Sequence, residues 1–348
     1  YRKRLQYQTF DITSLIADCK LDVELALADG WFRGSSAAYG VTNVYGDRTA
    51  VLAQIEFSYS DGSSEIIGTD SSWNWSNDGP IRFADLKDGE IYEANRVPTF
   101  SGKALEVMPE KSVKATRLVS SNNVPVKHHE HFRAKKLKAA DGTTVYDFGQ
   151  NIAGVIQFKV KAKKGQKITL VCGEILDAKG RVDLSNIQEQ KPANGWTQLS
   201  LIKKLTTNSV KGASVGTPLQ QVDFTASGNE DFYRSQFTFF GFRYAEISGD
   251  FEIDESDIEA VAIYSNLKQT GQFSCSNPLI NKLHENTLWS MKGNFLDIPT
   301  DCPTRERLGW TGDGQIFFNT GSYMMDIAPF MKKWMYGVQG HRLFCGMG

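Results

Sequence analysis

Ile156-Gln-Phe-Lys-Val-Lys-Ala-Lys-Lys-Gly165-Gln-Lys-Ile-Thr-Leu-Val-Cys172 is the stretch that decides the fold class. Apolar and polar side chains alternate on both sides of a turn at Lys164-Gly165, so each half has one apolar and one polar face. Such a pair is typical of an antiparallel sheet with one buried face. A later aromatic run, Phe237–Ile247, predicts a further strand of the same domain.

The same alternation occurs twice nearer the N-terminus, at Leu21–Leu27 and at Val51–Tyr59. The second run ends at Asp61-Gly62, which is a hairpin signal. We therefore expect a multidomain, mainly β chain. Two antiparallel, jelly-roll-like β-sandwich domains would lie in series, over residues 1–115 and 120–268.

Two polar segments are expected to lack regular structure. Glu110–Pro125 is rich in Lys and Ser, so we interpret it as the connection between the two β domains. Residues 185–230 are polar and irregular, which predicts a long loop that leaves the second sandwich.

The pattern becomes helical in the C-terminal part, residues 272–348. Ser276-Asn277-Pro278 combines a capping side chain with Pro in the first turn, and apolar residues follow at helical spacing. Two more helices are expected over 316–325 and 329–337, whereas 338–348 has no clear pattern. Three helices bury too little for a core of their own, so this part is expected to begin a larger helical domain.

The composition excludes several classes of protein. With 39 basic and 40 acidic residues among 348, the chain lacks the basic excess of a nucleic-acid-binding protein and the polybasic patch of a membrane anchor. No run approaches the ~20 apolar residues that span a bilayer. The five cysteines form no CxxC pair and no zinc spacing, so no metal or cofactor is predicted.

The compartment and the assembly leave few traces in the sequence. Sparse, unpaired cysteines suit free thiols in a reducing compartment, which slightly favours the cytoplasm. The chain starts at Tyr1 rather than Met, so a secreted or periplasmic protein with a removed signal peptide is the alternative. An incomplete helical domain would expose apolar surface, so the chain could form a homo-oligomer.

The segment richest in chemistry is residues 301–313. Pro303, Gly309 and Gly312 shape it as a loop rather than a helix, so its three carboxylates, two arginines and one tryptophan can converge on one pocket. Glycoside cleavage needs a carboxylic acid that protonates the leaving oxygen, carboxylates that hold sugar hydroxyls, and an aromatic face against the ring. Taken alone, the segment also fits a surface loop with ordinary ion pairs. It reads Asp301-Cys-Pro-Thr-Arg-Glu306-Arg-Leu-Gly-Trp310-Thr-Gly-Asp313.

This string resembles the signature loop of the α-L-rhamnosidases of glycoside hydrolase family 78. The resemblance continues upstream, because Tyr146–Gly154 and Phe239–Gly249 are similar to the second β domain of that family. Gly30–Gly34 and Thr69–Trp73 are similar to its first β domain. The similarity covers nearly the whole chain in the family's order, and it implies that the C-terminal helices begin an (α/α)6 barrel.

The resemblance also implies roles for the loop residues. Glu306 is implied to be the general acid. Asp301, Arg305, Trp310 and Asp313 are implied to bind a terminal α-L-rhamnose of a glycoside or polysaccharide, with no cofactor. The apolar C5 methyl group of this 6-deoxy sugar suits the face of Trp310.

The family inverts the anomeric configuration, which implies a second carboxylate as base, about 6.5–9.5 Å from the acid. In the family this Glu lies much later in the barrel, beyond the sequence given. We therefore expect a fragment of an inverting exo-glycosidase that does not turn over by itself. Two alternatives stay open: a non-catalytic carbohydrate-binding β-sandwich protein, and a related (α/α)6 glycosidase with another sugar preference.

Other polar or aromatic features receive structural interpretations. The three histidines of the His128–His131 run are residues that could bind zinc or nickel. On a strand, however, the middle histidine would face away from the other two. Asp147–Asn151 is expected to cap backbone groups at a turn. Gly30–Phe32 and Trp73–Trp75 are expected to pack in cores or between domains rather than stack on sugars. Cys302 lacks a nearby His and is expected to pack.

Overall fold

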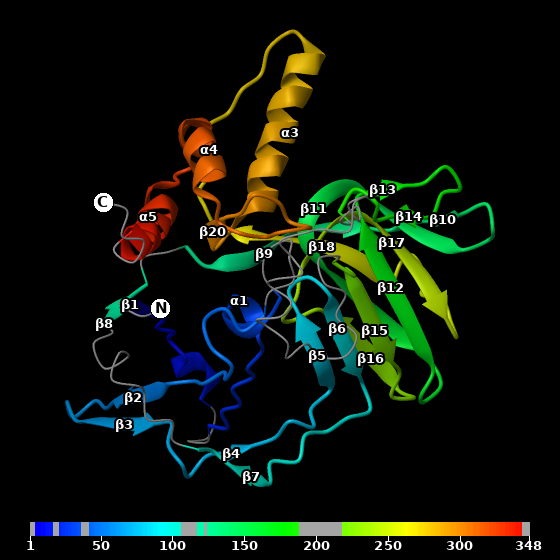
Figure 1. The fold of residues 1–348 in the computed structure, drawn as a ribbon. Coiled ribbons are helices and arrows are strands. Elements are labelled where there is room, and N and C mark those ends of the chain that lie inside the picture. Colours follow the sequence, from blue (N-terminus) through cyan, green and yellow to red (C-terminus); the bar gives the residue numbers. More distant parts are fainter. Residues whose placement is uncertain are drawn as a thin grey trace, which may run out of the picture.

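The computed structural model describes residues 4–16, 21–35, 42–105, 117–121, 124–187 and 218–342. Strands form the first part and helices the last (Figure 1). The expected order of a mainly β chain followed by a few helices is thus confirmed. In the described parts of the chain, no helix is long and apolar enough to cross a membrane.

The N-terminal region contains short strand pairs. Strands β2 (Gln54–Ser58) and β3 (Ser64–Gly68) form an antiparallel hairpin around Asp61-Gly62, as the sequence predicts. The remaining described elements are β1 (Arg4–Tyr7), a 3₁₀ turn (Thr13–Leu15), α1 (Gly30–Arg33), β4 (Asn74–Trp75), β7 (Gly102–Lys103) and β8 (Arg117–Ser120). β1 pairs in parallel with β8, and β4 pairs with β7.

Two expectations for this region are wrong. Leu21–Leu27 forms no strand, and its apolar side chains are substantially exposed. Alternation makes a segment amphipathic but supplies no pairing partner, and none of the described strands pairs with it. The connection Glu110–Pro125 is also not wholly irregular, because β8 lies inside it and hydrogen-bonds to β1.

One ten-stranded sheet folds around the main core (Figure 1). Its longest strand, β11 (Thr144–Lys161), pairs first with β10 and β17 and later with β18 and β16. A register shift between Asp147 and Ile152 marks the change. The other members are β5 (Ile81–Asp85), β6 (Gly89–Glu93), β9 (Val126–Arg133), β10 (Lys135–Lys138), β12 (Lys167–Gly173), β15 (Gln221–Thr225), β16 (Glu230–Arg234), β17 (Phe240–Gly249) and β18 (Ile258–Ser265). β13 (Ile175–Leu176) pairs with β14 (Val182–Asp183) beside it.

The sheet differs from the sequence expectation in two respects. β15 lies within residues 185–230, which were expected to form a loop, and it occupies the sheet between β6 and β12. Its partner β6 comes from the first predicted domain, so hydrogen bonds of one sheet cross between the two predicted domains. Sequence periodicity could not reveal this parallel pairing because the two strands are far apart in the chain.

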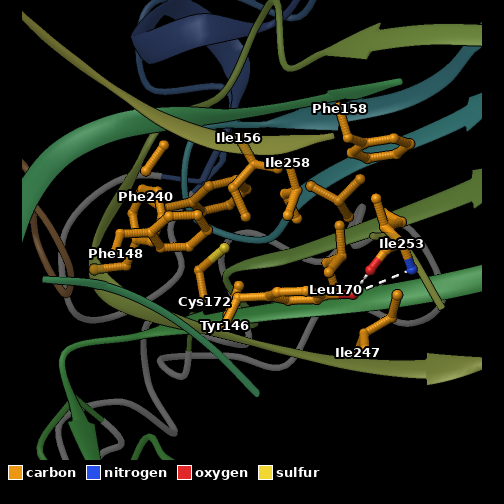
Figure 2. Close-up of a cluster of buried hydrophobic side chains, with 14 of the residues drawn as sticks. Tyr146, Phe148, Ile156, Phe158, Leu170, Cys172, Phe240, Ile247, Ile253 and Ile258 are labelled. Atoms are coloured by element: carbon orange, nitrogen blue, oxygen red, sulfur yellow. Dashed lines mark hydrogen bonds between the residues drawn. The ribbon is translucent and has the colours of Figure 1, made fainter. Parts of the chain in front are cut away.

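Aromatic and branched side chains fill the core of this sandwich (Figure 2). Ile156 and Phe158 of β11 and Leu170 of β12, all at alternating apolar positions of the quoted stretch, are at most 1% exposed. The buried Tyr146 hydroxyl forms two hydrogen bonds with the backbone of Ile253. It donates to Ile253 O (2.5 Å) and accepts from Ile253 N (3.1 Å).

The C-terminal part has the three expected helices, α3 (Pro278–Asn294), α4 (Thr311–Met324) and α5 (Ala328–Arg342). Asn277 caps α3 by accepting a hydrogen bond from Leu279 N, as predicted. α5 extends into 338–348, where no pattern was recognised. Between α3 and α4 lie β19 (Phe295–Leu296) and β20 (Ile298–Pro299), and a small apolar cluster joins the three helices.

Candidate active site

The carboxylate-rich segment forms a closed loop between β20 and α4. Asp301 N donates to Leu308 O, and Leu308 N donates back to Asp301 Oδ1, both at 2.9 Å. The loop interpretation therefore holds for the residues up to Trp310. It does not hold for the last three, because α4 begins at Thr311 and places Asp313 in its first turn.

Two other predicted site residues, Arg305 and Trp310, contact Glu306. Arg305 Nη2 donates to Glu306 Oε1 (3.0 Å), and Trp310 Nε1 donates to Glu306 Oε2 (2.8 Å). The Glu306 side chain is 16% exposed, whereas Trp310 is 49% exposed. The structure thus presents a largely covered carboxylate under a solvent-facing indole.

Asp301 holds the loop from the inside. Its Oδ1 accepts from Leu308 N, and its Oδ2 accepts a longer contact from the Cys302 thiol (3.3 Å). Burial, and more weakly the charge of Glu306, raise the pKa of Asp301 above its ordinary value. Cys302 Sγ also accepts from Glu306 N (3.2 Å), so this cysteine links the two acidic residues.

Asp313 is the predicted site residue that is not joined to the others. It is exposed in the first turn of α4, three residues after Trp310, and forms no hydrogen bond or ion pair with a described residue. A carboxylate at this position is favoured by the helix dipole. The structure therefore leaves its oxygens available to a ligand.

Arg307, one of the two arginines of the segment, anchors the loop. It is 1% exposed and has a left-handed backbone, with φ of 56°. Its guanidinium donates to Thr304 O (3.0 Å), Phe239 O (2.6 Å) and Gln220 Oε1 (3.0 Å). Burial lowers its pKa to about 10. The loop is thus attached to the β sandwich through a buried cation.

Two further residues in this anchor, Gln220 and Gly241, were missed by sequence reasoning, whereas Trp31 was expected to pack in a core or between domains. Gln220 bonds Arg307 and both backbone groups of Gly241. A Cβ at Gly241 would lie 2.5 Å from Thr304 Cγ2, so only Gly lets the loop approach β17. A Gly inside an aromatic strand was the available signal for such an approach. Trp31 Nε1 donates to Arg307 O (2.9 Å) from the N-terminal region.

Buried charges surround this anchor at the β5–β6 turn. Asp85 accepts hydrogen bonds from the backbone N–H groups of Ser35, Lys87 and Asp88. Burial, followed by the charge of Asp85, raises the pKa of Asp88 to about 6. The negative charges of Asp85 and Asp88 in this turn partly oppose the effect of burial on the pKa of Arg307.

Comparisons with known proteins cover the same regions. Residues 1–135 match the alpha-L-rhamnosidase N-terminal domain, 137–264 the bacterial alpha-L-rhamnosidase concanavalin-like domain, and 268–346 the bacterial alpha-L-rhamnosidase 6 hairpin glycosidase domain. The chain belongs to the α-L-rhamnosidases of glycoside hydrolase family 78. In the ten-stranded sheet, β11, β12, β15, β16 and β17 lie within the residues that match the concanavalin-like domain. β5, β6 and β9 lie within those that match the N-terminal domain.

Individual α-L-rhamnosidases agree with this assignment. An alpha-L-rhamnosidase of Streptomyces avermitilis is 33% identical over 345 residues, which are 96% of this chain and 31% of that protein. The native Aspergillus terreus enzyme has a TM-score of 0.81 at 33% identity, over 99% of this chain and 38% of that one. The S. avermitilis structure complexed with L-rhamnose has a TM-score of 0.79 at 31% identity, over 97% and 31%. The chain spans 31–35% of the length of the curated relatives it matches.

The other sequence candidates of this family member have protein partners. His129 stacks on Tyr264 with ring centroids 3.6 Å apart, and His131 Nδ1 lies 2.9 Å from Glu259 Oε2. Asp147 accepts from Gly149 N (2.7 Å), which confirms the expected backbone cap. Over the residues the structure describes, no three or more His, Cys, Asp or Glu side chains group to hold a metal ion.

Proposed function

We propose that this chain is the N-terminal part of an inverting exo-α-L-rhamnosidase, with Glu306 as the general acid. The observation that carries the proposal is the carboxylate of Glu306, which accepts a hydrogen bond from Trp310 and is held in a loop that is itself anchored on the sandwich. A rigidly placed carboxyl beside an exposed aromatic face is the arrangement that cleavage of a terminal sugar needs.

The contacts of Glu306 hold both of its carboxyl oxygens. Its two oxygens accept from Arg305 and Trp310, and both of these groups are donors only. Neither can accept the proton of a protonated Glu306, so that proton has no acceptor in these two neighbours. The oxygen of a scissile glycosidic bond would provide one.

The sugar would lie against Trp310 and be held by polar side chains around it. Trp310 offers its exposed face to the C5 methyl side of rhamnose. Asp313 and Arg305, both exposed, would hydrogen-bond the hydroxyl groups. Asp301 is more constrained, because loop contacts occupy both of its oxygens, so its contact with substrate would use the remaining lone pairs.

The general base is proposed to lie outside this chain. An inverting mechanism needs a carboxylate about 6.5–9.5 Å across the sugar from the acid. Asp301, the acidic residue that shares the loop with Glu306, is used in closing that loop. We therefore expect the chain by itself to bind weakly and not to turn over.

Hydrolysis of p-nitrophenyl α-L-rhamnoside tests the proposal. The assay compares this chain with a version extended through the whole barrel, and with the extended version carrying Glu306→Gln. We expect activity in the extended protein alone, and a drop of about 10²–10⁴ in kcat on Glu306→Gln. Asp326→Asn is the matched control: an exposed carboxylate on the same helical region, expected to leave kcat unchanged.

Three outcomes would contradict parts of the proposal. Activity of the short chain would put the base within these 348 residues. Full activity of Glu306→Gln would remove its role as acid. Activity on aryl fucosides or glucosides but not on the rhamnoside would replace the sugar assignment, and no activity at all would favour a non-catalytic carbohydrate-binding protein.

A further inference from the structure

A cavity lies on the sandwich, and no residue of the signature loop lines it. It has a volume of about 550 Å³, within the range of small-molecule sites. Val155 of β11 and Ile263 of β18 form an apolar floor. The walls come from β9, β16, the segment after β16, and Tyr92 of β6. None of the proposed catalytic residues lines it.

Positive charge is concentrated in this cavity without a matching acidic partner. Arg234 and Lys127 both line it, and within the described ranges neither forms an ion pair or a side-chain hydrogen bond. Arg234 is half-buried, so its guanidinium gives up part of its hydration. A half-buried cation without a protein partner is the group that an anionic ligand would satisfy.

The pKa of His128 is also affected by the positive charge in this cavity. Burial, followed by the charge of Arg234, lowers the pKa of His128 below its ordinary value. The neutral imidazole then offers one donor and one acceptor beside Arg234 and Lys127. None of the described residues that line the cavity is acidic. Glu90, which does not line the cavity, accepts hydrogen bonds from Tyr233 and from the backbone N–H groups of Gln236 and Phe237.

The remaining lining suits a ring with hydroxyl groups. Phe232 is 52% exposed and supplies an aromatic surface. The Gln236 side chain is exposed and forms no hydrogen bond with a described residue. Ser235 Oγ shares one hydrogen bond with Tyr233 and keeps further capacity. An inorganic anion would use the cations but leave the aromatic and apolar walls unsatisfied.

We propose that this cavity binds a carboxylated pyranose, a uronate unit, with Arg234 and Lys127 on the carboxylate and the ring against Phe232. This site is non-catalytic and independent of the hydrolysis proposed above. It would give the protein an affinity for acidic polysaccharide. The carboxylate would meet the guanidinium in the bidentate geometry that Arg favours.

Isothermal titration of the whole chain with sodium D-glucuronate tests the proposal, with glucose and sodium sulfate as the neutral and ring-free probes. We expect saturable binding of glucuronate, at least tenfold weaker binding of glucose and of sulfate, and an at least tenfold loss on Arg234→Gln. Arg133→Gln is the matched control, because it removes the same charge from exposed β9 outside the cavity. We expect no change there.

Every other result overturns the proposal. If sulfate binds as tightly as glucuronate, the cavity is a simple anion site. If glucose binds as tightly, it is a neutral-sugar site. If glucuronate binding does not saturate, the cavity does not bind a uronate. Loss on Arg133→Gln as well would indicate non-specific charge attraction. If Arg234→Gln fails to fold by circular dichroism, Lys127→Gln replaces it, since Lys127 is exposed at the cavity rim.

Discussion

The concanavalin-like sandwich and the helical part bury apolar surface to very different extents. In the sandwich, alternating residues such as Leu170 and Phe224 are at most 1% exposed. In the helices, Leu283 is 64% exposed and Ile316 is 82% exposed, although both stand at apolar helical positions. The same kind of residue is therefore core in one region and surface in the other. Apolar spacing makes a face, and burial needs a partner for that face.

The candidate active site lies where these two regions meet, and its supports come from the sandwich side. Arg307 reaches Phe239 and Gln220 across the boundary, and Trp31 bonds the backbone of Arg307. The loop geometry should therefore depend on the sandwich more than on the helices. The following substitutions test that difference, from the largest expected effect to the smallest.

Truncation of the same residue type separates the two regions most sharply. Leu170→Ala should lower the free energy of unfolding by about 2–5 kcal/mol, because it leaves a cavity in a closed core. Leu283→Ala on exposed α3 should change it by less than about 0.5 kcal/mol. Urea unfolding followed by fluorescence measures both. Equal effects would mean that the helix face is covered in solution.

Removal of the buried cation should release the loop from the sandwich. Arg307→Met abolishes three hydrogen bonds, at a cost of about 2–4 kcal/mol. The buried carbonyls of Thr304 and Phe239 lose this donor, whereas Gln220 Oε1 keeps its bond from Gly241 N. Arg305→Met, on an exposed side chain, should cost no more than about 1 kcal/mol. Thermal melts together with limited proteolysis of the loop measure the difference. Unchanged cleavage in Arg307→Met would show that the helices alone hold the loop.

The free energy of unfolding should depend on pH through Asp88, which lies at the turn between β5 and β6. Because burial raises its folded pKa to about 6, from 3.8, the folded state binds a proton more tightly than the unfolded chain. Its contribution to stability is thus complete below about pH 4 and is lost as the pH rises through 6. Asp88→Asn should remove this loss between about pH 4 and 7 in melting experiments, while exposed Asp254→Asn should not. A wild-type melting temperature that rises over this range would contradict the assignment.

The exposed helix face should promote weak self-association. Ile316→Lys on α4 should weaken it about fivefold, or about 1 kcal/mol, since one apolar side chain is replaced by a charge. Gln315→Lys adds the same charge at a neighbouring exposed, polar position and should have little effect. Sedimentation velocity at two protein concentrations compares them. A strictly monomeric wild type would contradict the expectation that the exposed face of α4 promotes self-association.

Much of the architecture could be predicted from local signals. The hairpin at Asp61-Gly62, the cap and proline at Asn277-Pro278, and the order of strands before helices all agree with the structure. Turn and cap chemistry acts within a few residues, so a short segment contains all the atoms that decide it. The loop conformation up to Trp310 was predictable for the same reason, whereas the signature itself was recognised by its resemblance to a family.

Tertiary structure alone decided which strands pair and what holds the site. Leu21–Leu27 alternates as well as β12 does, yet none of the described strands pairs with it, whereas β15 pairs with β6 from another predicted domain. Trp31 and Arg307, 276 residues apart, share a hydrogen bond that no local pattern signals. A period of two tells which face of a strand is apolar and leaves its neighbour open, because that choice is made by packing over the whole chain.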